Sequence, residues 1–172
     1  MNDFHDAFIE AFSLIFDLDA DLVEIINLSL KITFSGVALS ALIGLPLGAA
    51  AALLRFPGRG TVVVLLNALM GLPPVVVGLV VYLLLSRAGP FGVLGLLFTP
   101  TAMIIAQCFL ITPIIAALTR QTTADLWDEY SDQLRSLGAT PARAVPTLLF
   151  DARVTLLTTI LAGFGRAFGE VG

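Results

Sequence analysis

The sequence contains few charged residues. Only 13% of its 172 residues are charged and 58% are hydrophobic, whereas a typical soluble domain has about 25% charged residues. A chain so poor in charge cannot hide its apolar surface inside a water-soluble globule, so we infer that lipid surrounds it. The net charge is −4 and the sequence has no basic patch, which argues against a nucleic-acid partner.

Cysteine and histidine are almost absent, since Cys108 and His5 are single occurrences. A lone cysteine excludes a disulfide within the chain, and a lone histidine gives no zinc site, so we expect no bound metal or cofactor. The sequence has no Gly-x-x-x-x-Gly-Lys-Ser/Thr loop, so the chain is not expected to bind ATP. The sequence also shows no pattern of a nucleophile with a companion base, which argues against an intramembrane enzyme.

Long uncharged segments make up most of the chain. Three uncharged segments are each followed directly by an arginine: residues 32–54, 60–86 and 88–119. Each segment exceeds the roughly 20 residues that a helix needs to cross the hydrocarbon. None alternates polar with apolar residues, as β-barrel strands would. The sequence therefore predicts an all-α, polytopic membrane helix bundle. Its expected spans lie near residues 28–54, 61–86, 92–118 and 154–172 onward.

Arginine is distributed unevenly among the loops. The loop after the first span holds Arg55 and Arg59, and the loop after the second holds only Arg87. The positive-inside rule makes the arginine-rich first and third loops cytoplasmic, so the N-terminus is expected outside. The arginines in or beside the third loop are Arg120, Arg135, Arg143 and Arg153.

Residues 1–27 form an acidic segment on the expected outer side. Seven Asp or Glu and no Lys or Arg occur in the first 24 residues. Phenylalanine recurs there at every fourth position, which predicts an amphipathic helix on the outer membrane face. These residues are Phe4, Phe8, Phe12 and Phe16.

Adjacent prolines interrupt the second span. Pro73 and Pro74 remove two backbone donors and should kink or break the helix. Broken helices at membrane depth often line a polar pathway, so we place Pro73, Pro74 and Gly78 beside a translocation pathway. Close helix packing is the alternative explanation for the prolines and for the glycine.

The fourth span contains two charges, Arg166 and Glu170. They are four residues apart and share one helix face. A charge at the middle of a span costs roughly 2.5–3.5 kcal/mol, so both side chains should face the bundle interior or a wet cavity. Two hypotheses stay open: a purely structural ion pair, or a pair that belongs to the translocation pathway.

A compact charged stretch, residues 120–153, separates the third and fourth spans and is called the charged loop below. Thr122 and Asp125 are typical of a capping box and predict a new helix start. An apolar stripe at helical spacing follows, which could rest on the membrane or dock a soluble partner. The stripe consists of Leu126, Trp127, Tyr130, Leu134 and Leu137.

The charged loop also contains a corner. Gly138 suits the left-handed residue that ends a helix. Thr140 and Pro141 then predict the start of a second helix, which Pro146 should limit to little more than one turn. A rigid helix, corner and second helix favour a docking element over a plain amphipathic linker.

Five stretches resemble one family of membrane proteins. "DQLRSLGATPARAVPTLLFDAR" resembles the EAA loop in permease subunits of binding-protein-dependent ABC importers, with Gly138 as its glycine. "SLKITFSGVALSALIGLPLGAAAALL" resembles the first core span of that family. "GLPPVVVGLVVYLLLSRAGPFGVLG", "FTPTAMIIAQ" and "RAFGEVG" are similar to the branch that imports tungstate, molybdate and sulfate, and most to tungstate permeases. The resemblance covers residues 28–172, which we assign to one ABC permease transmembrane domain.

The resemblance implies a fold, partners and a function. It implies a type I ABC importer permease that forms a homodimer, an extracytoplasmic binding protein that delivers the oxyanion, and a cytoplasmic ABC ATPase that binds ATP and Mg. The charged loop would be the coupling loop that docks on this ATPase. Its docking residues would be Asp132, Gln133, Leu134, Leu137, Gly138, Ala139, Thr140 and Pro141. Family members continue for further spans, so we expect a C-terminally incomplete permease from the cytoplasmic membrane of a bacterium or archaeon.

Other functions remain as alternatives. Tungstate is favoured, but molybdate or sulfate would fit the same motifs. An ion-driven secondary transporter would need acidic residues inside its spans, and the first three spans contain none. A non-transporting membrane scaffold would not need the double proline or the charges of the fourth span.

Overall fold

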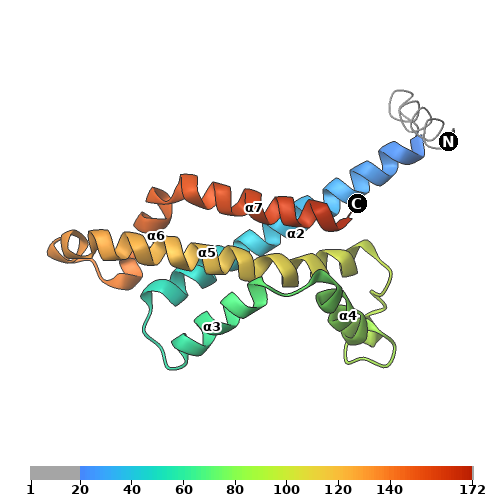
Figure 1. Ribbon diagram of the computed structural model, residues 1–172, viewed down its shortest axis with the longest axis horizontal. Helices are drawn as coiled ribbons and strands as arrows, with labels where there is room; N and C mark the ends of the chain where they lie inside the picture. Colours follow the sequence, from blue (N-terminus) through green and yellow to red (C-terminus); the bar gives the residue numbers. More distant parts are fainter. Residues whose placement is uncertain (1–19, 172) are drawn as a thin grey trace, which may run out of the picture.

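The computed structural model describes residues 20–171, and within that range every regular element is a helix. Helix α5 (Pro100–Ser136) runs through the middle of an elongated bundle, with α7 (Arg153–Val171) beside it and α2 (Ala20–Leu53) crossing it at an angle (Figure 1). The all-α fold class is confirmed. The helix expected around the N-terminal phenylalanines lies outside the described residues.

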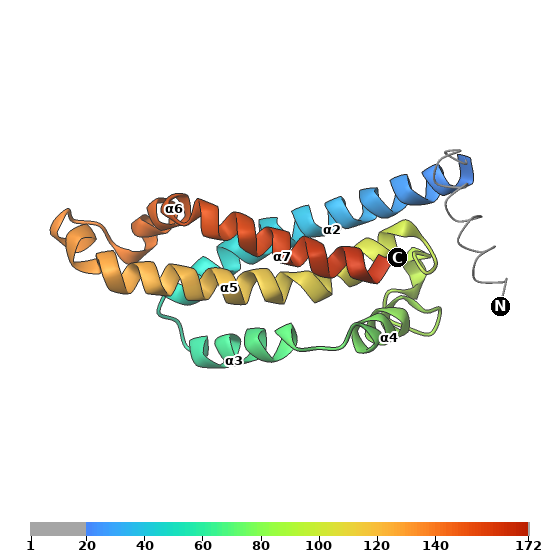
Figure 2. The ribbon, with the colours of Figure 1, turned by 45° about the horizontal axis from the view of Figure 1, so that its top comes forward.

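The second predicted span is divided into α3 (Arg59–Met70) and α4 (Pro74–Leu85), which lie on the side of α5 opposite α7 (Figure 2). The two helices are bent by 108° at the break. Pro74 occupies the first turn of α4, where its missing N–H is tolerated. It also pushes Pro73 into an extended conformation with ψ 137°. The break predicted from the two prolines is confirmed.

α2 packs along α5 through small side chains. They recur at every fourth position on its buried face: Gly36, Ser40, Gly44 and Gly48. A Cβ at Gly44 would lie 3.0 Å from the Cβ of Ile115, and one at Gly48 would overlap the carbonyl oxygen of Ala116. Small residues thus allow the two backbones to approach closely, as is common between membrane helices.

α2 is closed at its C-terminus by a side chain from the next helix. Arg59 donates from Nε to the carbonyl oxygen of Ala51 at 2.7 Å and from Nη2 to that of Ala52 at 2.6 Å. A cation at this end of a helix satisfies free carbonyls and complements the helix dipole. From the sequence, Arg59 was expected only to mark the topology; in the structure it also fixes the connection between α2 and α3.

α5 starts later than the third predicted span, which was expected over residues 92–118. The hydroxyl of Thr99 caps the helix by accepting a hydrogen bond from the N–H of Ala102 at 3.4 Å. Pro100 then takes a first-turn position, which suits its missing donor. The preceding chain instead contains a short 3-10 helix, η1 (Gly92–Leu94).

α5 also continues into the charged loop as far as Ser136. The helix start predicted at Thr122 is therefore wrong. Residues 114–136 contain no glycine or proline that would stop the helix, and Thr123, beside the expected cap, is completely buried. Packing of this stretch outweighs the weak local capping signal.

α6 (Pro141–Asp151) runs for 11 residues, so the expectation that Pro146 limits it to about one turn is wrong. Pro146 is exposed, and a carbonyl that loses its helical partner on that side can bind water instead. α6 and α7 meet at Ala152 with a bend of 74°, a second corner that the sequence did not indicate.

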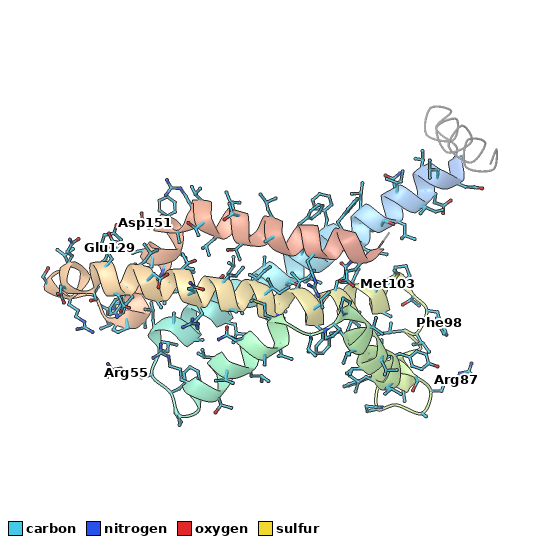
Figure 3. All side chains as sticks on the ribbon, in the orientation of Figure 1. Arg55, Arg87, Phe98, Met103, Glu129 and Asp151 are labelled. Carbon is cyan, nitrogen blue, oxygen red and sulfur yellow. The ribbon has the colours of Figure 1, made fainter. Side chains whose placement is uncertain are left out.

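Charged side chains lie at both ends of the bundle. Figure 3 shows Arg55, Glu129 and Asp151 at one end and Arg87 at the other, near Phe98. By length and composition, α2 and α5 can each cross a membrane, and the bent pairs α3–α4 and α6–α7 bring the number of candidate spans within residues 20–171 to as many as four. This arrangement fits a multi-pass membrane protein whose polar ends lie on opposite sides.

Candidate functional site

The break in the second span is tied to α7 by an arginine. Nη2 of Arg166 donates a hydrogen bond to the carbonyl oxygen of Leu72 at 3.3 Å. In a continuous helix that carbonyl would accept from Val76, but here the N–H of Val76 bonds to Pro73 at 3.0 Å. The double proline thus frees a carbonyl, and Arg166 satisfies it from 94 positions away along the chain.

Arg166 also forms an ion pair with Glu170. Its Nε lies 3.5 Å from Oε1 of Glu170, and the two side chains are 37% and 25% exposed. The pairing predicted from their four-residue spacing is therefore present. One guanidinium group connects the freed backbone carbonyl to a carboxylate, so neither charge of the fourth span lies alone.

A pocket of about 200 Å³ lies where α4, α5 and α7 meet. Three residues that the sequence placed in the pathway line it: Pro74, Gly78 and Glu170. Pro73 lies at the N-terminal cap of α4, and Arg166 reaches the site through its ion pair. The five predicted pathway residues thus lie in one region, although they come from segments far apart in the sequence.

One polar residue of this pocket was not predicted from the sequence. Gln107 on α5 lines the pocket and is only 6% exposed. The signal that could have identified it is its polarity, because it is the only Gln, Asn or charged residue between Arg87 and Arg120.

A larger cavity of about 660 Å³ lies along α2, α3, α4 and α5. Its wall consists almost entirely of aliphatic and aromatic side chains, with Cys108 and Thr112 as the polar exceptions. Such a wall offers no charge and few donors to an anion. The smaller pocket near Arg166 is therefore the better candidate for polar chemistry.

The corner of the charged loop has the geometry that the sequence predicted. Gly138 has φ 78°, in the left-handed region. Its N–H donates to the carbonyl of Arg135 at 2.9 Å, and the N–H of Ala139 donates to that of Leu134 at 2.9 Å. This is the Schellman pattern of a helix C-terminus. Thr140 begins α6 in an extended conformation, without a side-chain capping bond.

The apolar stripe of the charged loop packs inward for most of its length. Leu126, Trp127, Tyr130 and Leu134 contact a buried cluster that joins the end of α2 to α6: Ala52, Leu53, Ala144 and Leu148. Leu137 departs from the stripe and is 83% exposed. The loop is therefore held firmly on the bundle, and Leu137 is the apolar side chain that it exposes at the corner.

The expected docking residues surround this corner. Leu134 and Ala139 are half-buried, so Leu134 serves packing as well as any docking. The others are exposed: Asp132, Gln133, Leu137, Gly138, Thr140 and Pro141. The charged loop that contains them lies at the end of the bundle where Figure 3 labels Glu129 and Asp151.

Comparison with known proteins agrees with this architecture. The chain is 39% identical to a probable anion ABC transporter permease protein of Haloferax volcanii over 88% of this chain and 65% of the relative. It is 34% identical to the tungstate uptake system permease protein TupB of Peptoclostridium acidaminophilum over 97% and 73%. It is 31% identical to the sulfate transport system permease protein CysT of a Synechocystis strain over 69% and 44%.

The chain spans about two thirds of the length of the first two of these relatives. The family model described as "binding-protein-dependent transport system inner membrane component" matches residues 44–171. That range holds the broken span, the pocket, the charged loop and Arg166. The chain belongs to this family of inner-membrane components, the permeases of type I ABC importers.

Proposed function

We propose that this protein is the permease subunit of an ATP-driven ABC importer that moves an oxyanion, tungstate above others, across the cytoplasmic membrane of a bacterium or archaeon. The observation that carries the proposal is the similarity to a tungstate uptake permease over 97% of the chain. The pocket between α4, α5 and α7, with a guanidinium beside it, is consistent with an anionic cargo.

The proposed pathway passes the break in the second span. Pro73 and Pro74 open the helix there, and Gly78 leaves space on α4, since a Cβ at this position would meet nothing within 4 Å. Arg166 attracts the anion, and Glu170 reduces that attraction by pairing with the arginine. A site that binds weakly suits a transporter because the anion must leave as readily as it enters.

The proposed partners act at opposite ends of the bundle. A cytoplasmic ABC ATPase, which binds ATP and Mg, docks on the exposed corner around Leu137 and Gly138. An extracytoplasmic binding protein delivers the oxyanion at the other end, and two permease copies enclose the pathway between them. ATP binding to the ATPase then moves the charged loop and opens the pathway to the outside.

The proposed topology places the N-terminus outside and the charged loop in the cytoplasm. Arg55 lies at the same end of the bundle as Glu129 and Asp151 of the charged loop, whereas Arg87 lies at the opposite end (Figure 3). Grouping of the two arginine-rich loops at one end is what the positive-inside rule requires.

Cysteine labelling tests this topology. With Cys108 replaced by serine, a cysteine placed at the exposed Ser136 should resist a membrane-impermeant thiol reagent in intact cells and react after lysis. A cysteine in place of Ala88, in the loop that holds Arg87, is the matched control and should react from outside. Labelling of position 136 in intact cells would reverse the orientation.

Reconstitution tests the function itself. Proteoliposomes that contain the full transporter, with its ATPase and binding protein, should accumulate tungstate only when ATP is present. Molybdate and sulfate, added as competitors, identify the preferred anion. Uptake driven by a proton or sodium gradient without ATP would indicate a secondary transporter, and absence of uptake of all three anions would indicate a scaffold.

A variant of the corner tests the coupling role in the same assay. Gly138→Val should insert normally but retain about tenfold less ATPase on co-purification, because a β-branched residue is strained at positive φ by more than about 1–2 kcal/mol. A Cβ there meets nothing within 4 Å, so no clash confuses the result. Gly138→Asn is the control, since asparagine tolerates this conformation. Full ATPase retention by Gly138→Val would refute the docking role.

A further inference from the structure

Gln107 is a buried amide without a partner. The residue is 6% exposed, and among the described residues neither Nε2 nor Oε1 has a hydrogen-bond partner. The side chain is also confined, because a Cβ on Gly36 of α2 would lie 2.5 Å from Oε1. Buried polar groups are nearly always paired, since an unpaired one is costly. An amide that is both confined and unpaired therefore requires an explanation.

The surroundings of Gln107 supply that explanation. Gln107 lines the pocket of about 200 Å³ together with Pro74, Gly78 and Glu170. One water occupies about 30 Å³ in the liquid, so this pocket is large enough for a tetrahedral anion of four oxygens. An amide nitrogen is a donor with two N–H groups, which is the chemistry that an oxyanion oxygen binds.

The electrostatics of the pocket favour brief occupancy by an anion. Pro74 lies in the first turn of α4, so the pocket lies at the positive end of that helix dipole. The Glu170 carboxylate opposes an anion, but the guanidinium of Arg166 lies 3.5 Å from it and offsets its charge. Because the charges of Arg166 and Glu170 nearly balance, a hydrogen bond from a neutral donor such as Gln107 determines whether an oxygen of the anion is bound in the pocket.

We propose that Gln107 is an oxyanion contact of the translocation pathway: its Nε2, which is buried in this conformation, donates a hydrogen bond to one oxygen of the anion when α4, α5 and α7 separate to let the anion pass. The proposal rests on the proposed function and adds to it a residue on α5. The contact lowers the barrier to passage, so it affects the turnover of transport. The affinity for the anion is set by the binding protein.

Two substitutions test this contact in proteoliposomes that hold the complete transporter, with tungstate as the probe. Gln107→Leu keeps the size but removes the donor, and should lower kcat for ATP-driven uptake by at least about tenfold, the loss expected for one hydrogen bond to a charged group. KM should stay unchanged. Gln107→Glu places a negative charge in the pocket and should lower kcat further.

Thermal unfolding distinguishes the contact from a structural role. Because Gln107→Leu removes a buried unpaired amide, its unfolding midpoint should stay equal or rise. Thr119→Val is the matched control: it removes a buried, unpaired hydroxyl from α5, outside both the pocket and the charged loop, and should leave kcat at the wild-type value.

The outcomes separate this proposal from the proposed function. Wild-type kcat in both Gln107 variants overturns the contact alone. The contact is also overturned if the Gln107 variants have a lower unfolding midpoint and their uptake falls only in proportion to the amount of folded transporter. That result would assign Gln107 to packing. If the wild-type transporter takes up no tungstate, molybdate or sulfate, the proposed function and this contact both fail.

Discussion

A leucine in place of Gly48 should prevent the bundle from folding. A Cβ at this position would overlap the carbonyl oxygen of Ala116 and lie 2.8 Å from the Cβ of Thr119 and 3.0 Å from the backbone nitrogen of Arg120. Two of these three atoms are backbone and cannot rotate away. Overpacking of a well-packed core costs about 1–3 kcal/mol, and we expect the destabilisation by Gly48→Leu to exceed the upper end of this range. Gel filtration of the detergent extract should show no monodisperse peak.

Gly165 provides the matched control for this substitution. It also lies in a helix, α7, but it is exposed and a Cβ there would meet nothing within 4 Å. Gly165→Leu should therefore keep the wild-type peak and unfolding midpoint, since leucine is also the better helix former. Equal behaviour of the two leucine variants would show that the close approach of α2 and α5 is not required.

Removal of the charges of α7 should strongly reduce transport. Arg166→Gln should lower oxyanion uptake by at least about tenfold at matched expression, because it removes the positive charge beside the pocket and weakens the bond to the Leu72 carbonyl. Glu170→Gln should have a smaller effect, since it leaves the arginine with its backbone partner. The double change should stay as inactive as Arg166→Gln.

The double change distinguishes the two hypotheses for this pair. If Arg166 and Glu170 form only a structural ion pair, removal of both charges should restore much of the lost uptake, because no single charge stays buried. Restored uptake would therefore contradict a pathway role for Arg166, and so would full activity of Arg166→Gln alone. Unfolding midpoints of the three variants show how much of each loss comes from stability.

Backbone constraints were the features that could be predicted from the sequence. Adjacent prolines exclude a continuous helix whatever surrounds them, so the break at Pro73 and Pro74 was predicted. Gly138 lies between a helical pattern and a Thr-Pro start, and glycine in the left-handed conformation is a common end of a helix. Each of these features depends on a few neighbouring residues, and the structure shows all of them.

Features that depend on distant contacts could not be predicted in the same way. The capping signal at Thr122 was a weak local preference, and packing of α5 on α2 and α6 outweighs it. The structure also tolerates Pro146 because that residue is exposed, which the sequence does not reveal. Gln107 is a candidate only because α4 and α7 meet α5 around it, which the sequence does not reveal.

The continuity of α5 has a mechanical consequence. Gln107 and Ser136 belong to the same helix, and at 1.5 Å per residue their separation along the axis is roughly 44 Å. If α5 tilts about the midpoint of this stretch by roughly 5°, each end is displaced by about 2 Å, which is the scale of helix shifts in allosteric proteins. A rigid α5 would then act as a lever: a push on the charged loop at Ser136 would move the wall of the pocket at Gln107 in the opposite direction.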